Sequence, residues 1–403
     1  MDCILKGAKV YIDGLFKTTN IFVSNGVITN ISNLIKEPLK SIVFDFSGFF
    51  IFPGLIDVHV HLREPGFSYK ETIKTGTLAA SHGGFTTICT MPNLKPAPDN
   101  LSNLNEELKL IKDNALIEVI PYGTITKNED GLELANYEEI KNYIVGISDD
   151  GNGVQSDEVM FKAMLESNKN NLIIAAHSED KRYLSGDVKS EYIQIARDIK
   201  LLEKTHSKHH VCHISTKDSV NLIREAKKNN LDITCETAPH YLVLTKDDAE
   251  DDGAYKMNPP LRLKEDKDAL IRGIIDGTID IIATDHAPHS TEEKSLGFEK
   301  SLNGIVGLET SFPILYTNLV KKNIISLEKL IQLMHDNPKK RFKIGTDIKI
   351  GEKANLTVFD LNNKYIIDSN KFLSKGRSSP FNNMEVYGKC KMTMYNGKIV
   401  WEE

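Results

Sequence analysis

The sequence predicts an α/β fold, a (β/α)8 TIM barrel with a small β-sandwich-like domain formed by both termini. Eight short apolar stretches rich in β-branched residues recur mostly roughly 30 residues apart, the spacing of one βα unit. Segments with apolar residues at three-to-four spacing, typical of amphipathic helices, lie between these stretches. Both ends of the chain show strand-like alternation interrupted by turn residues instead.

The predicted barrel strands and helices alternate in one unbroken series. The strands are expected over 55–61, 86–90, 117–121, 145–148, 172–177, 210–213, 232–236 and 279–285. The helices are expected over 69–82, 101–113, 156–167, 191–205, 216–229 and 263–276. The first of these helices ends at Gly83-Gly84, a helix stop signal. A doubly wound open sheet is the alternative, but eight strands in one series favour a closed barrel.

The two ends of the chain predict a single small domain. Asn25-Gly26 and Asn396-Gly397 suit tight hairpin turns between alternating segments. We therefore expect residues 1–52 and 350–403 to build one composite β domain. The barrel, over residues 53–349, is then inserted between its two halves.

The composition excludes several classes of protein. The 403 residues are 40% hydrophobic and 26% charged, which suits a globular protein and argues against a disordered chain. A formal net charge of −6 argues against a partner that is nucleic acid or an acidic membrane. The five cysteines are scattered and odd in number, which is typical of reduced thiols. Because the sequence also shows neither a signal-peptide layout nor an apolar run of the ~20 residues that span a bilayer, we expect a cytoplasmic location.

Polar residues follow nearly every predicted barrel strand. Seven of the twelve histidines lie at strand ends or in the loops that follow: His59, His61, His177, His213, His240, His286 and His289. Active sites of such barrels gather at the carboxyl ends of the strands. The clustering therefore predicts a functional site there, whereas His206, His209 and His210 precede a strand end and are expected at the surface or the barrel bottom.

The strand-end residues suit a metal site. His59 and His61 alternate on one strand, so both imidazoles point to the same face and can bind one divalent ion. His177 and His213 supply two more nitrogens, Asp285 supplies an oxygen, and either Asp149 or Asp150 can bridge two ions. Four histidines and two aspartates suit a pair of zinc ions about 3.5–4 Å apart. The alternative is that His177 and His213 only form hydrogen bonds inside the core.

Several motifs together resemble the metal-dependent amidohydrolases, and more narrowly the dihydroorotase family in its longer bacterial type. They are Asp57-x-His59-x-His61-x-Arg63-x-Pro65-Gly66, Met91-Pro92-Asn93, Asp149-Asp150-Gly151, Cys212-His213-x-Ser215-Thr216, Met257-Asn258-Pro259-Pro260-Leu261-Arg262 and Thr284-Asp285-His286-Ala-Pro-His289. The similarity runs essentially from end to end and includes the split β domain.

The resemblance implies a role for each candidate ligand. His59, His61 and Asp285 hold one metal, His177 and His213 hold a second, and a carboxylate bridges the two. Only one of two neighbouring strand residues can face the site. We expect Asp150, next to Gly151 as in the family, to be the bridge, with Asp149 as the fallback. The expected cofactor is Zn²⁺, one or two ions per subunit, with two favoured.

The resemblance also implies the substrate, N-carbamoyl-L-aspartate or (S)-dihydroorotate, and the residues that bind it. Arg63 shares the face of His61, and its planar guanidinium can clamp the unreactive carboxylate. Asn93 can donate from its amide. His289 is implied as a third contact, while Asn258 and the Asn303-Gly304 backbone would meet the urea-like edge of the ring. Without the resemblance, Arg63 reads as one half of a salt bridge with Glu64 or another acid, and Asn93 as a turn residue.

The expected reaction is the reversible cyclisation of N-carbamoyl-L-aspartate to dihydroorotate and water in pyrimidine biosynthesis. In the hydrolytic direction, a hydroxide generated by the metals attacks the ring carbonyl. Asp285 takes a proton and passes it to the departing ring nitrogen, as general base and then general acid.

Three alternatives to this function were weighed. Allantoinase and dihydropyrimidinase would use the same metal site, but Arg63 argues against the first and the aspartate bridge against the second. A non-catalytic partner of aspartate transcarbamoylase would have lost ligands, and this chain keeps them all. A purely structural barrel would have no reason to place ligands at its strand ends. Beyond the substrate, we expect a homodimer and an association with aspartate transcarbamoylase.

The chain departs from the family pattern in two places. Only 36 residues separate His177 from His213, so the fifth βα unit lacks a usual insertion. Ser301-Leu302-Asn303 stands where relatives often have proline and phenylalanine before the glycine. His240 has no assigned role and is expected to be a hydrogen-bonded loop residue.

Overall fold

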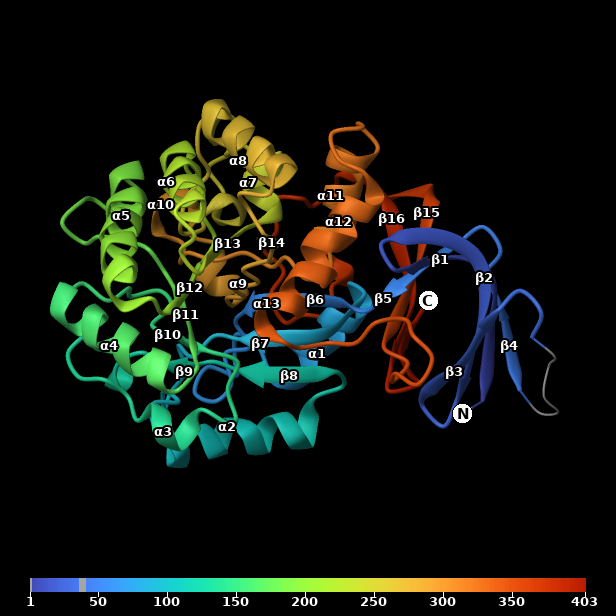
Figure 1. Ribbon diagram of the computed structural model, residues 1–403. Helices are drawn as coiled ribbons and strands as arrows, with labels where there is room; N and C mark the ends of the chain where they lie inside the picture. The colour runs from blue at the N-terminus through green and yellow to red at the C-terminus, as the bar shows by residue number, and fades with distance from the viewer. Residues whose placement is uncertain (1, 36–40) are drawn as a thin grey trace.

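The computed structural model describes residues 2–35 and 41–403. Residue 1 and residues 36–40, which belong to the predicted terminal domain, lie outside the described part. Within it, parallel strands ringed by helices make up one region, and an eight-stranded sheet makes up the other. Figure 1 shows that both termini lie in this second region, at the right of the view. No helix of the described residues is both long enough and apolar enough to cross a membrane.

The barrel strands follow the predicted series. They are β6 (Leu55–Val60), β7 (Phe85–Thr90), β8 (Glu118–Pro121) with β9 (Gly123–Thr124), β10 (Ile147–Ser148), β11 (Ile173–Ala176), β12 (Lys208–Val211), β13 (Ile233–Thr237) and β14 (Ile281–Ile282). Neighbouring strands pair in parallel, β6 to β8 in one sheet and β9 to β14 in another. The third strand is split at Tyr122, whose N–H donates to Thr90 on one side while Gly123 bonds to Gly146 on the other.

The ring closes between its first and last strands. Val60 forms a parallel bridge with His286, and the His61 N–H donates to the His286 carbonyl at 2.8 Å. Both faces of these strands are buried, as expected of parallel strands that helices cover. The prediction of a TIM barrel is confirmed.

Helices cover the outside of the barrel (Figure 1). They are α1 (Ile73–His82), α2 (Leu101–Asn114), α3 (Tyr137–Ile140), α4 (Asp157–Lys169), α5 (Val188–Thr205), α6 (Lys217–Lys228), α7 (Pro239–Val243), α8 (Lys264–Asp276), α9 (Thr291–Lys294), α10 (Gly297–Lys300), α11 (Ser311–Leu315), α12 (Leu327–Ile331) and α13 (Asn337–Phe342). The π-helical turns η4 (Tyr316–Val320) and η5 (Gln332–Asp336) continue α11 and join α12 to α13, and the short 3-10 turns are η1 (Lys127–Glu129), η2 (Lys246–Asp248), η3 (Gly253–Tyr255) and η6 (Ser369–Lys371).

Two helix predictions need correction. The helix expected from residue 69 begins at Ile73, because the Thr72 side chain caps it by accepting from the Thr75 N–H. The helix expected from residue 191 begins at Val188, because Asp187 caps it in the same way.

The second region is a sheet to which both ends of the chain contribute. Its strands are β1 (Cys3–Ile12), β2 (Leu15–Ser24), β3 (Val27–Ser32), β4 (Ile42–Asp45), β5 (Phe50–Pro53), β15 (Leu356–Ile366), β16 (Glu385–Tyr395) and β17 (Lys398–Glu402). The antiparallel pair β15–β5 joins the C-terminal strands to the N-terminal ones. Both Asn-Gly turns are confirmed, with positive φ at Asn25, Gly26, Asn396 and Gly397 as a two-residue hairpin requires.

Aromatic side chains connect the sheet to the barrel helices. The ring centroids of Phe52 and Phe359 lie 5.0 Å apart, and Phe312 of α11 lies 4.2 Å from Phe359. The sheet also has its own core, which includes Leu5, Ile21 and Met394. We keep the division into residues 1–52 plus 350–403 and residues 53–349 as a proposal that this strand arrangement supports.

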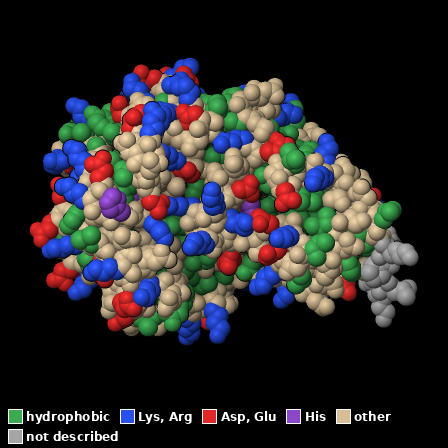
Figure 2. Space-filling model, viewed as in Figure 1, with side chains coloured by type: hydrophobic (Ala, Val, Ile, Leu, Met, Phe, Trp, Pro, Cys, Tyr) green, Lys and Arg blue, Asp and Glu red, His purple; other side chains and the backbone are tan. Residues whose placement is uncertain are grey.

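The surface carries both signs of charge. On the face drawn in Figure 2, lysine and arginine side chains are interspersed with aspartate and glutamate.

Candidate metal centre

The six predicted ligands all lie at the carboxyl ends of barrel strands. His59 belongs to β6, and the others follow the ends of their strands within a few residues: His61, Asp150, His177, His213 and Asp285. Their side chains are buried, with no more than 10% of any of them exposed. The barrel therefore brings groups from five strands to one point.

Asp150 lies at the centre of this group. Its Oδ1 is 3.5 Å from His59 Nε2, from His177 Nδ1 and from His213 Nε2. Its Oδ2 is 3.3 Å from His61 Nε2. Burial opposes ionisation, but the surrounding histidines hold the pKa of Asp150 well below its usual value. One carboxylate thus faces four imidazoles.

Asp285 lies beside the first pair of histidines. Its Oδ1 is 3.3 Å from His61 Nε2 and 3.6 Å from His59 Nε2. Its pKa is lowered despite burial, chiefly by the His61 hydrogen bond and the nearby His59.

Asp149 points away from this group. Its side chain accepts hydrogen bonds from the Ile125 and Thr126 N–H groups and from the Thr126 hydroxyl. Neighbouring residues of a strand face opposite sides, and here Asp150 is the one that faces the histidines.

The donor atoms fit divalent cations. His59, His61 and Asp150 form one group with ligand atoms within 4.8 Å of one another, and Asp150, His177 and His213 form a second. His59 Nε2 and Asp150 Oδ1 are buried and have no hydrogen-bond partner among the described residues. Buried polar atoms are normally paired, so an ion between these groups would satisfy them. The residues present therefore fit a metal ion bound by imidazole and carboxylate ligands.

Three of the histidines are oriented by acceptors on the side away from Asp150. His59 Nδ1 lies 2.6 Å from Glu236, His61 Nδ1 lies 2.9 Å from Asn93 Oδ1, and His177 Nε2 lies 3.4 Å from Glu179. Because carboxylate and amide oxygens only accept, these ring nitrogens carry the protons. The opposite nitrogens face Asp150, and His177 Nδ1 also lies 3.0 Å from His213 Nε2. In a metal site these are the nitrogens that would bind the ion.

Three site residues have left-handed backbone conformations. Arg63, His213 and Asp285 have φ angles of 60°, 34° and 50°. Such angles are uncommon outside glycine and cluster at functional sites, where the surrounding structure holds them.

The predicted substrate contacts lie around the metal group. Asn93 touches His61 directly, and its amide NH₂ remains for another partner. Arg63 Nε donates to the Pro288 carbonyl, and Arg63 forms no ion pair with any carboxylate of the described residues. Glu64 instead accepts from the Ile73 N–H at the start of α1, so the salt bridge considered for Arg63 is absent.

The remaining predicted substrate contacts are held in place by other residues of the protein. His289 Nε2 donates to the Asn303 carbonyl at 2.8 Å, and Lys70 Nζ lies 3.1 Å from His289 Nδ1. Asn258 donates to Glu179 at 3.0 Å. Gly304 has φ 137°, and a Cβ there would lie 2.4 Å from the Ala287 carbonyl oxygen, which requires glycine.

His240 differs from expectation, since it lies in α7 rather than in a loop, and its Nε2 has no partner among the described residues. Of the three histidines expected at the surface or the barrel bottom, His206 is exposed, whereas His209 and His210 are buried in β12. His210 donates to Glu236, a residue that the sequence analysis did not single out. The sequence signal that could have identified Glu236 is a carboxylate at the end of a predicted strand that is expected to be buried.

Known proteins resemble this chain over its whole length. The family model described as "Dihydro-orotase-like" matches residues 48–187. A curated dihydroorotase from Fusobacterium nucleatum is 46% identical over 418 residues, covering 99% of this chain and 98% of the relative. The chain belongs to the dihydroorotase family. A second dihydroorotase, from Bacillus cytotoxicus, is 45% identical and covers 97% of this chain and 96% of its own length.

Solved structures support the fold assignment. An L-hydantoinase (dihydropyrimidinase) from Arthrobacter aurescens aligns with a TM-score of 0.90 at 29% identity, covering 100% of this chain and 96% of that one. A dihydropyrimidinase from Brevibacillus agri aligns with a TM-score of 0.89 at 23% identity, covering 100% and 95%. The higher identity to dihydroorotases favours that activity over the related cyclic amidases, and the chain is a cyclic amide hydrolase of this family.

Proposed function

We propose that the dihydroorotase reaction takes place at the centre formed by His59, His61, Asp150, His177, His213 and Asp285. There, N-carbamoyl-L-aspartate cyclises reversibly to (S)-dihydroorotate with loss of water, a step of pyrimidine biosynthesis. The observation that carries this proposal is the position of Asp150, whose two oxygens face all four imidazoles. A carboxylate shared in this way suits two cations that act on one substrate.

The proposed cofactor is two Zn²⁺ ions per subunit. His59, His61 and Asp285 would hold one, His177 and His213 would hold the other, and Asp150 would bridge them. When bound, such ions lower the pKa of a water molecule to about 7 and polarise a carbonyl group. Mixed imidazole and carboxylate ligands suit borderline ions such as zinc.

Asp285 is the proposed general acid and base. In hydrolysis its carboxylate accepts a proton from the attacking water, the bond between the ring carbonyl carbon and nitrogen breaks, and Asp285 returns the proton to that nitrogen. In cyclisation the same carboxylate removes the proton from the ureido nitrogen, which attacks the side-chain carboxylate carbon; a C–O bond breaks, and Asp285 gives the proton to the departing oxygen, which leaves as water. The low pKa of Asp285 keeps it ionised and ready to accept.

Arg63 is proposed to bind the carboxylate that does not react. Its guanidinium has no carboxylate partner within the described residues and therefore keeps donors for a bidentate pair with the substrate. Asn93, whose oxygen is bonded to His61, offers its NH₂ to the same carboxylate. His289 is the third contact, while Asn258, Asn303 and Gly304 are proposed to meet the urea-like edge.

The other proposals concern the surroundings of the enzyme. All five cysteines are buried free thiols, which supports a cytoplasmic location. A homodimer and an association with aspartate transcarbamoylase also remain proposals. Sedimentation of the pure protein, alone and with that partner, would test both.

Turnover assays combined with metal analysis test the function. We expect about two equivalents of zinc, activity on dihydroorotate that a chelator abolishes, and far slower turnover of allantoin and dihydrouracil. Faster turnover of allantoin or dihydrouracil, or full activity after removal of all metal, would overturn the proposal.

A further inference from the structure

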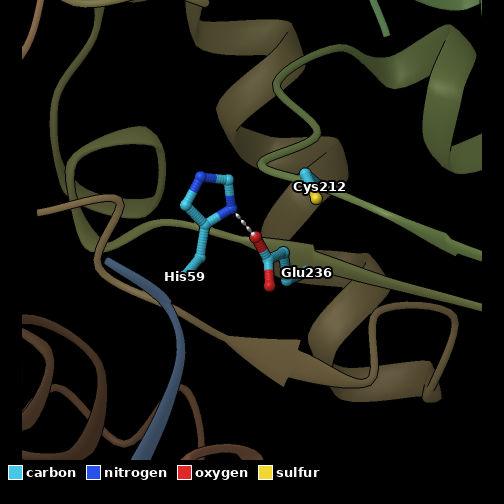
Figure 3. Close-up of side chains that lie close together, drawn as sticks. All are labelled: His59, Cys212 and Glu236. Atoms are coloured by element: carbon cyan, nitrogen blue, oxygen red, sulfur yellow. Dashed lines mark hydrogen bonds and ion pairs between the residues drawn. The ribbon is translucent and has the colours of Figure 1, made fainter. Parts of the chain in front are cut away.

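A buried carboxylate lies behind the metal centre. Glu236, in β13, is 1% exposed, and its Oε1 lies 2.6 Å from His59 Nδ1. Figure 3 shows Glu236 against one edge of the His59 ring, with Cys212 nearby. Because a carboxylate can only accept, His59 Nδ1 must be the protonated nitrogen. His59 Nε2 is then the nitrogen that turns its lone pair toward Asp150 and Asp285.

The second oxygen of Glu236 is also bonded. His210 Nε2 donates to Oε2 at 3.0 Å, and Thr234 Oγ1 lies 2.8 Å from His210 Nδ1. The threonine hydroxyl can donate to His210 Nδ1. Each hydrogen-bond donor among Thr234, His210 and His59 then has an acceptor. Thr234, His210 and Glu236 thus form a fully bonded support for His59, and buried networks of this kind are rigid.

Glu236 also reaches the second group of ligands. The His213 N–H approaches Glu236 Oε1 at 3.4 Å, and His213 has a φ of 34°. This residue is thus held in a backbone conformation that few non-glycine residues adopt. A single carboxylate therefore contacts one ligand from each of the two groups that share Asp150.

The competing interpretation is that Glu236 binds a metal ion directly instead of supporting His59. Ligand atoms of His59, Cys212 and Glu236 lie within 4.8 Å of one another. However, Nδ1 of His59 is already bonded to Glu236, and Nε2 faces the other carboxylates.

We propose that Glu236 is a positioning residue of the metal centre. Through His59 it fixes the tautomer and direction of one ligand, and through the His213 N–H it holds the backbone of another. This inference rests on the proposed metal centre. It predicts that Glu236 governs metal affinity more than the stability of the metal-free fold.

The substitution Glu236→Gln separates these two effects. Glutamine keeps the size of the side chain but has only one acceptor oxygen, so it cannot receive both imidazole protons. If His210 moves its proton to Nδ1 and accepts from the glutamine NH₂, the glutamine oxygen still accepts from His59, but a neutral amide does so more weakly than a carboxylate and lowers the basicity of His59 as a ligand. We therefore expect a loss of metal affinity of about 10- to 100-fold.

The experiment titrates the zinc-loaded full-length protein with a chromophoric chelator. Melting temperatures with and without excess chelator are measured in parallel. Glu107→Gln is the matched control, because Glu107 of α2 is also 1% exposed and its oxygens have no partner among the described residues. We expect E236Q to lose zinc at a 10- to 100-fold lower chelator strength, with a reduced zinc-dependent rise in melting temperature. E107Q should release zinc as the wild type does.

The outcomes separate this inference from the proposed function. Zinc affinity of E236Q within about twofold of the wild type, against the 10- to 100-fold loss expected, overturns the role of Glu236 and leaves the proposed function intact. A wild-type protein that holds no zinc overturns both. If E236Q does not fold, Glu236→Asp replaces it, since the shorter carboxylate cannot reach both histidines; wild-type affinity in E236D would equally overturn the proposal.

Discussion

Two parts of the barrel site differ in how their side chains are hydrogen-bonded: the floor, where the proposed metal ligands lie, and the rim, where the proposed substrate contacts lie. On the floor, the outward nitrogens of His59 and His61 are bonded to Glu236 and Asn93. At the rim, Arg63 has a single hydrogen bond to a carbonyl, and His289 is bonded to the loop that carries Asn303. The proposed metal ligands are thus oriented by the fold itself, whereas Arg63 at the rim keeps donors for the substrate and His289 must give up a bond to the loop before it can contact the substrate through that nitrogen.

The largest expected effect, on bound zinc and on turnover, comes from substituting Asp150, one of two adjacent aspartates on the floor. Asp150→Asn should lose most of the bound zinc and essentially all turnover, because an amide cannot bridge two cations. Asp149→Asn should keep its zinc and lose about 1–3 kcal/mol of unfolding free energy, since Asp149 accepts from Ile125 and Thr126. Metal analysis and denaturant melts would measure both. The reverse pattern would identify Asp149 as the bridge.

Asp285 is proposed both to bind a metal ion and to transfer a proton to the substrate, and its substitution separates these two roles. Asp285→Asn should keep its zinc content near normal, because His59 and His61 remain. Turnover should fall by about 10²- to 10⁴-fold with the loss of the proton carrier. Turnover close to that of the wild type would refute the role of Asp285 as acid and base.

Arg63 tests the rim alone. Arg63→Lys keeps the charge but not the bidentate fork, so we expect KM for dihydroorotate to rise about 10-fold or more, with unchanged zinc content. Arg182→Lys is the control, since the Arg182 side chain is 78% exposed. An unchanged KM in R63K would remove Arg63 from the binding site.

The smallest effect concerns the pH dependence of stability at the rim. Burial, with help from Arg63 and Lys70, lowers the pKa of His289 to about 3. The unfolded chain binds a proton near pH 6.5 and the folded chain does not, so the stability that neutral His289 contributes is complete above pH 6.5 and falls as pH drops toward 3.

The variant His289→Gln removes this titration. The unfolding free energy of the metal-free wild type should therefore fall more steeply between pH 6.5 and 4 than that of H289Q. Denaturant melts at several pH values would measure the difference. Parallel curves would show that His289 is protonated in the fold.

The sequence predicted what depends on local pattern. The two-residue spacing of His59 and His61 places both rings on one face, and the strand series brings Asp150, His177 and His213 to the same mouth. The residues that orient the ligands depend on register between distant strands. His210 contacts Thr234 because β12 and β13 pair at those positions. No pattern in the local sequence predicts which residues of the two strands pair. The left-handed φ of His213 was equally hidden, because histidine is not a residue that signals it.

The proposed function requires two cations, one on either side of Asp150. Anomalous diffraction at the zinc edge, from crystals of the zinc-loaded protein, tests for them. We expect one peak among His59, His61 and Asp285 and a second beside His177 and His213, both within bonding distance of Asp150. A peak between His59, Cys212 and Glu236, or no peak near Asp150, would contradict the proposal.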